Sequence, residues 1–165
     1  MSIPVEGDIA PDFTLPRDDG SLFTLSAQLG KPVVLYFYPQ DDTEGCTIEN
    51  QEFSQLAGAF SQRGAVLLGI SPDDIARHCK FRDKYGLTAP LASDPDHVAI
   101  SAFGLWQAKV LYGRPYVGLV RTSFLIDATG RIAKIIKATR IKGHAQKMLD
   151  ALDALQNPSA KVSKR

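Results

Sequence analysis

The sequence predicts an α/β fold with a mixed central β-sheet flanked by helices. Residues 32–38 and 66–70 are unbroken apolar runs, as expected of strands buried on both faces of a sheet. Apolar residues recur at helical spacing after each run, and a strand–turn–strand pattern follows over 122–136. The order β-α-β-α, hairpin, α implies parallel strands joined by a crossover helix, with an antiparallel edge.

The N-terminal part predicts a β-hairpin extension ahead of this sheet. Residues 12–16 and 22–25 are typical of short strands, and Asp18-Asp19-Gly20 between them has the chemistry of a tight turn. The run 32–38 is then the central strand, because its aromatic and β-branched residues have no polar interruption.

A helix is expected over residues 46–63. Phe53, Leu56 and Phe60 are three and four residues apart, which places them on one face for the core, and Gly64 ends the helix. The strand 66–70 is followed by a helix that we expect to begin with Ser71 as its cap and to end at Gly86.

The stretch 86–120 is less regular, with a short helix expected after Pro95. Strands at 122–126 and 131–136 flank a turn at 128–130, and 143–155 has the apolar spacing of a helix. We interpret 1–156 as a single domain and 157–165, rich in Lys and Ser, as a flexible C-terminal tail.

Composition excludes several functional classes. The 19 Lys and Arg against 18 Asp and Glu give a net charge of +1, so neither nucleic acid nor an anionic membrane is expected as a partner. The apolar runs are too short to span a bilayer, and the N-terminus lacks the pattern of a secretory signal, which favours the cytoplasm. No nucleotide motif occurs, and the three histidines lack ligand spacing, so no metal or cofactor is expected.

The loop after the central strand contains the candidate catalytic residues Pro39, Thr43, Gly45 and Cys46. Ligands of open α/β sheets bind outside the carboxyl ends of the strands. A cysteine in the first turn of a helix lies where unpaired N–H groups and the helix dipole stabilise a thiolate. The alternative is that Cys46 is a small buried apolar side chain, but its polar, glycine-bearing surroundings favour a reactive thiol open to a small oxidant.

Residues 36–47 resemble the signature of the peroxiredoxin family, in which a proline, three residues, a threonine and two residues precede the reactive cysteine. Further matches at 10–13, 69–71, 84–87 and 121–127 resemble the bacterioferritin comigratory protein, or Q-type, branch. The resemblance covers nearly the whole chain except the tail. It implies a thioredoxin-like fold and thiol-dependent peroxidase activity.

The resemblance also implies roles for individual residues. Cys46 is then the peroxidatic cysteine, which attacks the peroxide and becomes a sulfenic acid. Thr43 is expected to hydrogen-bond the sulfur and the peroxide, Pro39 to shield the thiolate, and Arg121 to hold the thiolate as an anion. Glu49 either pairs with Arg121 or is a first-turn acid that stabilises the helix dipole, and both interpretations stay open.

The position of a resolving cysteine, which reduces the sulfenic acid by forming a disulfide, differs between relatives. Some relatives carry it five residues after the peroxidatic cysteine, where this chain has Gln51, and others at the position of Arg82. Cys79 lies one helical turn before Arg82. Either Cys79 forms a disulfide with Cys46 after local unwinding, or an external thiol resolves a one-cysteine enzyme.

Other functions fit less well. A thioredoxin dithiol needs Cys-x-x-Cys, but Glu49 stands at the second cysteine position. The rival from another class is a redox-inactive thioredoxin-like binding or chaperone domain. The expected partners are a peroxide and a reductant such as thioredoxin or a similar thiol. We expect a monomer, with a weak dimer as the alternative.

Overall fold

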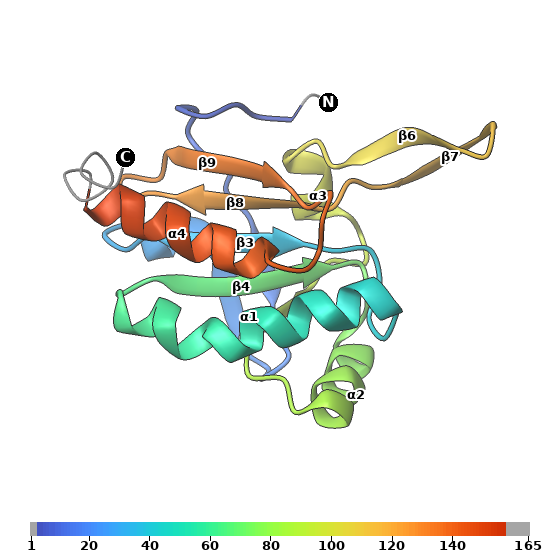
Figure 1. Ribbon diagram of the computed structural model, residues 1–165, viewed down its shortest axis with the longest axis horizontal. Coiled ribbons are helices and arrows are strands. Elements are labelled where there is room, and N and C mark those ends of the chain that lie inside the picture. Colours follow the sequence, from blue (N-terminus) through green and yellow to red (C-terminus); the bar gives the residue numbers. More distant parts are fainter. Residues whose placement is uncertain (1–2, 158–165) are drawn as a thin grey trace.

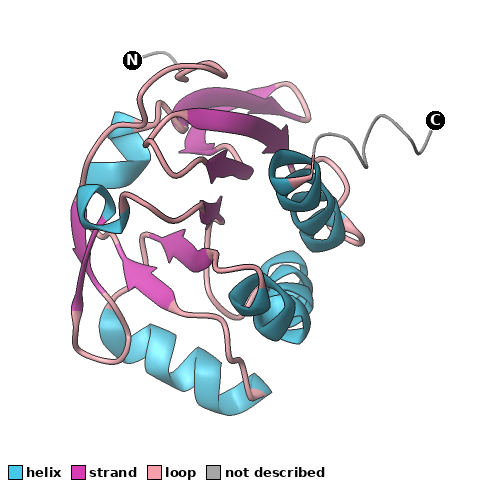
Figure 2. Ribbon diagram, turned by 90° about the vertical axis from the view of Figure 1, so that its left-hand side faces the viewer, coloured by secondary structure: helices cyan, strands magenta, loops and turns pink. Residues whose placement is uncertain are grey.

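The computed structural model describes residues 3–157, and its centre is a five-stranded sheet with helices on both sides (Figures 1 and 2). The strands lie in the order β5-β4-β3-β8-β9. β3 runs parallel to β4 and β4 parallel to β5, whereas β8 is antiparallel to both β3 and β9. The predicted mixed sheet is therefore confirmed. Its strands are β3 (Val33–Phe37), β4 (Val66–Ser71), β5 (Leu91–Ser93), β8 (Thr122–Ile126) and β9 (Ile132–Lys137).

Two long helices, α1 and α4, lie side by side across one face of the sheet (Figure 1). Their apolar stripes are buried against the strands, as the spacing of apolar residues predicts. α2 contacts β5 at the edge of the sheet. The helices are α1 (Glu44–Gln62), α2 (Ile75–Tyr85), α3 (Val98–Ala102) and α4 (His144–Gln156).

The core has two halves because successive side chains of β3 point to opposite faces of the sheet. Tyr36 points toward the helices and stacks on Phe53 of α1, with ring centroids 3.9 Å apart. Phe37 points to the other face and packs against Phe103, at 5.3 Å between centroids. All four rings are completely buried, so β3 is the central strand expected from its apolar run.

The N-terminal hairpin forms as predicted, from β1 (Thr14–Pro16) and β2 (Leu22–Thr24). Phe23 of β2 stacks on Phe13, and both close the face of the sheet opposite α1 and α4. A short 3₁₀ helix (Leu25–Gln28) follows and was not predicted.

The predicted start of α2 is wrong. Ser71 does not cap the helix but belongs to β4, where it pairs with Ser93 of β5. Asp74 is the cap instead, because its side chain accepts a hydrogen bond of 2.8 Å from the backbone N–H of Arg77. The predicted end is confirmed: Gly86 adopts the left-handed conformation, with φ of 63°, that commonly ends a helix.

Within the irregular stretch 86–120, the short helix after Pro95 is confirmed as α3, but the strand β5 and a further hairpin were not predicted. The hairpin consists of β6 (Trp106–Leu111) and β7 (Arg114–Leu119), and it projects from the body of the molecule (Figure 1). Its turn, Tyr112-Gly113, has positive φ at both residues. The sequence pattern misses this hairpin because apolar residues such as Val110 and Val117 are exposed rather than buried.

The remaining boundaries agree within a few residues. β8, β9 and α4 match their predicted segments, and α1 begins at Glu44, two residues before the predicted start. Residues 158–165 of the predicted tail lie outside the described residues. Within residues 3–157, none of the helices is both long and apolar enough to cross a membrane.

Candidate active site

The cysteine of the signature lies where strand β3 passes into helix α1. The chain leaves β3 at Phe37, forms a loop over residues 38–43, and enters α1 with Thr43 as its extended N-cap residue, at ψ of 157°. Cys46 is therefore in the first turn, where backbone N–H groups lack helical partners and favour a negative sulfur. This confirms the placement expected from the sequence.

Arg121 reaches the sulfur from a distant part of the chain. Its Nη1 atom lies 3.3 Å from Sγ of Cys46 and donates a hydrogen bond to it. The contact arises because β8 is antiparallel to β3, so that Thr122 at the start of β8 pairs with Phe37 at the end of β3. Arg121 immediately precedes Thr122 and thus lies beside the loop that leads to Cys46.

Glu49 contacts the same nitrogen of the guanidinium as Cys46 does. Its Oε1 atom is 2.6 Å from Nη1 of Arg121, and the side chain is 1% exposed. Of the two interpretations left open by the sequence, the structure shows the pair with Arg121. Burial raises the pKa of Glu49 to about 7, although the charge and hydrogen bond of Arg121 act in the opposite direction. Among the described residues, Oε2 of Glu49 has no hydrogen-bond partner.

The guanidinium itself stays charged. Burial alone would lower the pKa of Arg121, but the neighbouring Glu49 and Cys46 together raise it. The guanidinium of Arg121 therefore contacts two acidic groups, the thiol of Cys46 and the carboxyl of Glu49. A thiolate at Cys46 gains both the helix start and this cation as stabilising partners.

Three further residues of the signature lie in the 38–43 loop and the first turn of α1. The hydroxyl of Thr43 donates a hydrogen bond of 3.0 Å to the carbonyl of Gln40, and the structure shows no bond from it to the sulfur within the described residues. Pro39 is half-buried in the loop. A Cβ atom at Gly45 would lie 2.7 Å from Cδ1 of Ile141 and 3.5 Å from Nη2 of Arg121, so glycine permits the close packing at the helix start.

Access to the sulfur differs from the expectation. Cys46 is completely buried rather than open to solvent. Its surroundings are not purely apolar, however, because Arg121 contacts the sulfur and is itself 19% exposed at its side chain. Arg121, Thr43 and Gly45 are themselves partly exposed.

Cys79 lies on α2 and faces the N-terminal hairpin. Its half-buried thiol donates to the carbonyl of Asp18, with 3.5 Å between sulfur and oxygen. Both cysteines are free thiols in the structure. A bond between Cys79 and Cys46 would require the contact with Asp18 to break.

Sequence reasoning missed a set of buried polar residues that support the site. Asn50 of α1 donates a 2.9 Å hydrogen bond to the carbonyl of Cys46 and accepts one of 2.8 Å from the hydroxyl of Tyr36. Asp41 in the 38–43 loop contacts His78 of α2 at 2.6 Å. The consecutive aspartates before Thr43 were the available sign of a buried polar network, but the residues that they contact are far away in sequence.

Three buried side chains could together ligate a metal, although the sequence predicts no such site. Donor atoms of Asp41, Asp73 and His78 lie within 4.8 Å of one another. Each is already engaged by the protein: one oxygen of Asp73 accepts from Ser71 and from the N–H of Asp41, and the other pairs with Arg77. The cluster is therefore explained as a hydrogen-bond network.

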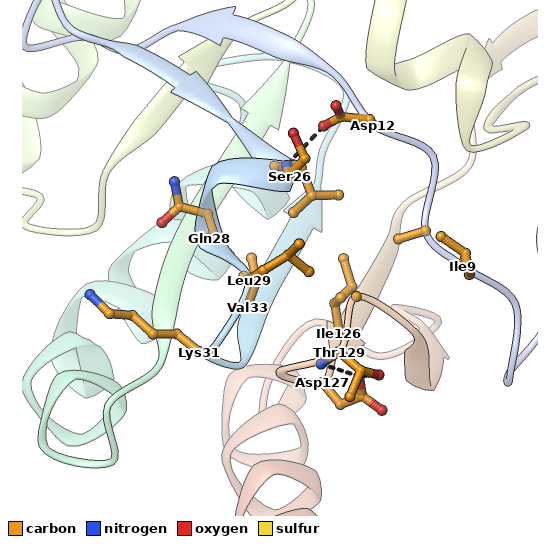
Figure 3. Close-up of a pocket in the computed structure, with 13 residues that line it drawn as sticks. Ile9, Asp12, Ser26, Gln28, Leu29, Lys31, Val33, Ile126, Asp127 and Thr129 are labelled. Atoms are coloured by element: carbon orange, nitrogen blue, oxygen red, sulfur yellow. Dashed lines mark hydrogen bonds between the residues drawn. The ribbon is translucent and has the colours of Figure 1, made fainter.

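A separate cavity of about 290 Å³ lies at the other end of β3 (Figure 3). It opens near Val33 at the start of the strand, whereas Cys46 follows the strand's end. A five-residue strand spans roughly 16 Å, so this cavity is not where a peroxide would meet the thiol. Its lining is mainly apolar and includes Ile9, Leu25, Leu29, Val33 and Ile126.

The sequence matches the AhpC/TSA family over residues 6–135, which includes Cys46, Glu49 and Arg121. The chain belongs to this peroxiredoxin family. The protein "Peroxiredoxin Bcp" of Bacillus subtilis is 39% identical over 161 residues, covering 98% of this chain and all of that protein.

Solved structures of peroxiredoxins have the same fold as this chain. A mutant of Xylella fastidiosa PrxQ superposes with a TM-score of 0.86 at 34% identity, covering 94% of this chain and 99% of that one. The bacterioferritin comigratory protein of Xanthomonas campestris has a TM-score of 0.83 at 34% identity, with 93% and 98% covered. The thioredoxin-like fold is thereby confirmed, and the activity of this peroxiredoxin is that of a thiol-dependent peroxidase.

Proposed function

We propose that this peroxiredoxin reduces hydrogen peroxide and organic hydroperoxides through Cys46. The thiolate attacks one peroxide oxygen, an S–O bond forms as the O–O bond breaks, and Cys46 becomes a sulfenic acid. The departing oxygen leaves as hydroxide or alkoxide and takes up a proton to give water or an alcohol. Two electrons pass from sulfur to the peroxide.

The observation that carries the proposal is the 3.3 Å contact between Nη1 of Arg121 and Sγ of Cys46 at the first turn of α1. Peroxide cleavage needs a thiolate nucleophile and fixed donors where negative charge develops. The guanidinium meets both needs: it stabilises the thiolate form of Cys46, and its further N–H groups can donate to a peroxide oxygen. Glu49 orients the guanidinium through its ion pair with the same Nη1 atom.

The other signature residues are assigned supporting roles. Thr43 binds the peroxide with the lone pairs of its hydroxyl, whose proton is directed to Gln40. Pro39 shields the thiolate from water, and Gly45 leaves room for the substrate and Arg121. The Xanthomonas campestris structure concerns alkyl peroxide reduction, which supports organic hydroperoxides as substrates of this chain too.

The sulfenic acid must then be reduced by a thiol. We assign this step to thioredoxin or a similar thiol, either directly or after a Cys46–Cys79 disulfide has formed. The protein acts as an antioxidant in the cytoplasm, as one domain over 1–156 and as a monomer, with a weak dimer as the alternative. A redox-inactive binding or chaperone domain is the rival, and a guanidinium in contact with the thiol speaks against it.

Peroxide consumption with thioredoxin and thioredoxin reductase tests the proposal. Wild type and Cys79→Ser are compared with Cys46→Ser, which we expect to lose all turnover. Undiminished turnover in Cys46→Ser would exclude the proposed nucleophile, and no turnover in wild type would favour the binding domain. Replacing thioredoxin by a small dithiol in a parallel reaction separates a wrong reductant from a wrong activity.

Mass spectrometry without reductant separates the two resolution routes. After one equivalent of peroxide, a mass loss of two hydrogens and a peptide linking Cys46 to Cys79 indicate the disulfide. A stable sulfenic or sulfinic acid at Cys46, with Cys79 still free, would assign resolution to an external thiol. The Cys79→Ser variant shows which signals require the second cysteine.

A further inference from the structure

His78 of α2 is completely buried and connects three elements. Its Nδ1 atom is 2.6 Å from Oδ2 of Asp41 in the 38–43 loop. Its Nε2 atom is 2.8 Å from the carbonyl oxygen of Ala92 on β5. Both partners are oxygens, and the side chain has no exposure to solvent.

This geometry requires a proton on each ring nitrogen. The carbonyl of Ala92 can only accept, so Nε2 donates to it. Oδ2 of Asp41 shares one proton with Nδ1, and that proton resides on the histidine because imidazole is a stronger base than a carboxylate. His78 is thus an imidazolium paired with the Asp41 carboxylate. Burial acts to lower the pKa of His78, but the bonds to Asp41 and Ala92 together raise it.

The charges around the pair are balanced. Asp73, at the end of β4, is a second buried anion facing the pair, and its carboxylate forms a 2.9 Å ion pair with Arg77. The hydroxyl of Tyr38 donates to Oδ1 of Asp41 at 2.6 Å and stays neutral, because burial raises its pKa well above 10. Removing the imidazolium alone would leave Asp41 and Asp73 as two adjacent buried anions.

Asp41 in turn determines the path of the loop. Its backbone N–H donates a 2.7 Å hydrogen bond to Asp73, and its carboxylate receives bonds from Tyr38 and His78. The next residue, Asp42, has a positive φ of 61°, an uncommon conformation for a residue other than glycine. The anchored segment lies between Pro39 and Thr43 and leads directly to the turn that holds Cys46.

We propose that His78 is a positioning residue of the peroxidase site, acting through Asp41 on the 38–43 loop. The inference rests on the proposed function, since the loop carries Thr43, which is assigned to the peroxide, and Pro39, which is assigned to shielding the thiolate. The thiolate itself depends on Arg121 and the helix start, not on this loop. Loss of the pair should therefore slow the reaction with peroxide without changing the ionisation of the sulfur.

The test compares full-length His78→Gln, Asp41→Asn and the double variant with wild type. The rate constant for oxidation of Cys46 by hydrogen peroxide is measured by acid-quenched mass spectrometry. Each single variant should be about 10- to 100-fold slower, since small displacements in an active site have effects of this order. The double variant removes both charges and should recover to within about threefold of wild type.

The pH midpoint of Cys46 alkylation by iodoacetamide, measured in parallel, should stay at the wild-type value in all variants. Hydrogen exchange of peptides covering residues 38–44 should be faster in the two single variants only. The control is Lys84→Gln, which removes an exposed ion pair between the same helix and Asp42. We expect its oxidation rate to stay within about twofold of wild type.

Three results would overturn the inference while leaving the proposed function intact. These are single variants that react with peroxide at the wild-type rate, a double variant slower than either single variant, and a shifted alkylation midpoint. If His78→Gln folds poorly, the isosteric Asp41→Asn variant decides alone by the same criteria. A wild type that does not react with peroxide would instead refute the proposed function, and this inference with it.

Discussion

Replacing Glu49 by glutamine tests the electrostatics of the site through protein stability. The carboxyl group is 1% exposed, one of its oxygens lies 2.6 Å from Arg121, and the other lacks a partner among the described residues. Burial, partly offset by Arg121, raises its pKa from an ordinary 4.5 to about 7. The unfolded chain therefore ionises at lower pH than the folded protein does.

The expected size follows from this difference. At about 1.4 kcal/mol for each tenfold change in acid constant, a pKa raised from 4.5 to about 7 corresponds to about 3 kcal/mol. The stability that the protonated carboxyl contributes is fully present below about pH 4.5 and is lost as the pH rises to about 7. Glutamine does not titrate, so a Glu49→Gln protein should lack this loss.

The assay is urea unfolding at pH 5 and pH 8. Both proteins carry Cys46→Ser, because thiol ionisation would add a second pH-dependent contribution. The free energy of unfolding of Glu49→Gln, relative to its parent, should increase by about 2–3 kcal/mol between the two pH values, because pH 5 already lies above the ordinary pKa of 4.5. Any constant effect of losing the ion pair with Arg121 cancels in this comparison. Glu44→Gln, which replaces an exposed acid in the first turn of the same helix, controls for charge near the helix start.

A difference between Glu49→Gln and its parent that stays constant within about 1 kcal/mol across this range would refute the reasoning. It would mean that water or a movement of Arg121 solvates the carboxylate fully in the folded protein. The same data would then show that the site holds Glu49 as a carboxylate at neutral pH.

Arg121→Gln should move the pH midpoint of Cys46 alkylation upward and slow peroxide reduction about 100- to 1000-fold, because one charged donor to the sulfur is lost. Equal midpoints in the variant and wild type would disprove the role of Arg121 in stabilising the thiolate. Gly69→Ala places a Cβ atom 2.5 Å from the buried Tyr36 ring and should lower the free energy of unfolding, measured with urea, by about 1–3 kcal/mol. An unchanged urea midpoint of unfolding would show that the ring can move aside. Burial, with smaller effects of two nearby cations, lowers the pKa of His144 to about 4, so wild type should lose stability as the pH falls from about 6.5 to 4. The unfolding temperature of His144→Gln should fall less than that of wild type over this pH interval. Parallel curves of unfolding temperature against pH would contradict the lowered pKa of His144.

Much of the architecture followed from local patterns in the sequence. The apolar run 32–38 and the helical spacing of Phe53 and Phe60 each correspond to an element that the structure contains. The errors occurred where the pattern is weak. Ser71 has the character of a helix cap but pairs in β4, and the β6–β7 hairpin lies in the stretch 86–120, where the pattern is irregular and apolar residues are exposed.

The site divides in the same way. The order strand, loop, Thr43 and Cys46 can be recognised along the chain, because those residues act within one connected segment. The place of Arg121 was implied by family resemblance, and the pairing of β8 with β3 explains it physically. The contact between Glu49 and Arg121 could not be chosen over its alternative until both side chains were seen 2.6 Å apart.

The sequence by itself determined the class of fold, the helix start that holds Cys46 and the type of chemistry this thiol can perform. Tertiary structure alone decided that the sulfur is buried, that one guanidinium nitrogen contacts both the thiol and Glu49, and that His78 is paired with Asp41. The physical reason is that propensity and periodicity act over a few neighbouring residues. Charge pairing and burial depend on which distant segments the sheet brings together, and a local sequence pattern does not determine those contacts.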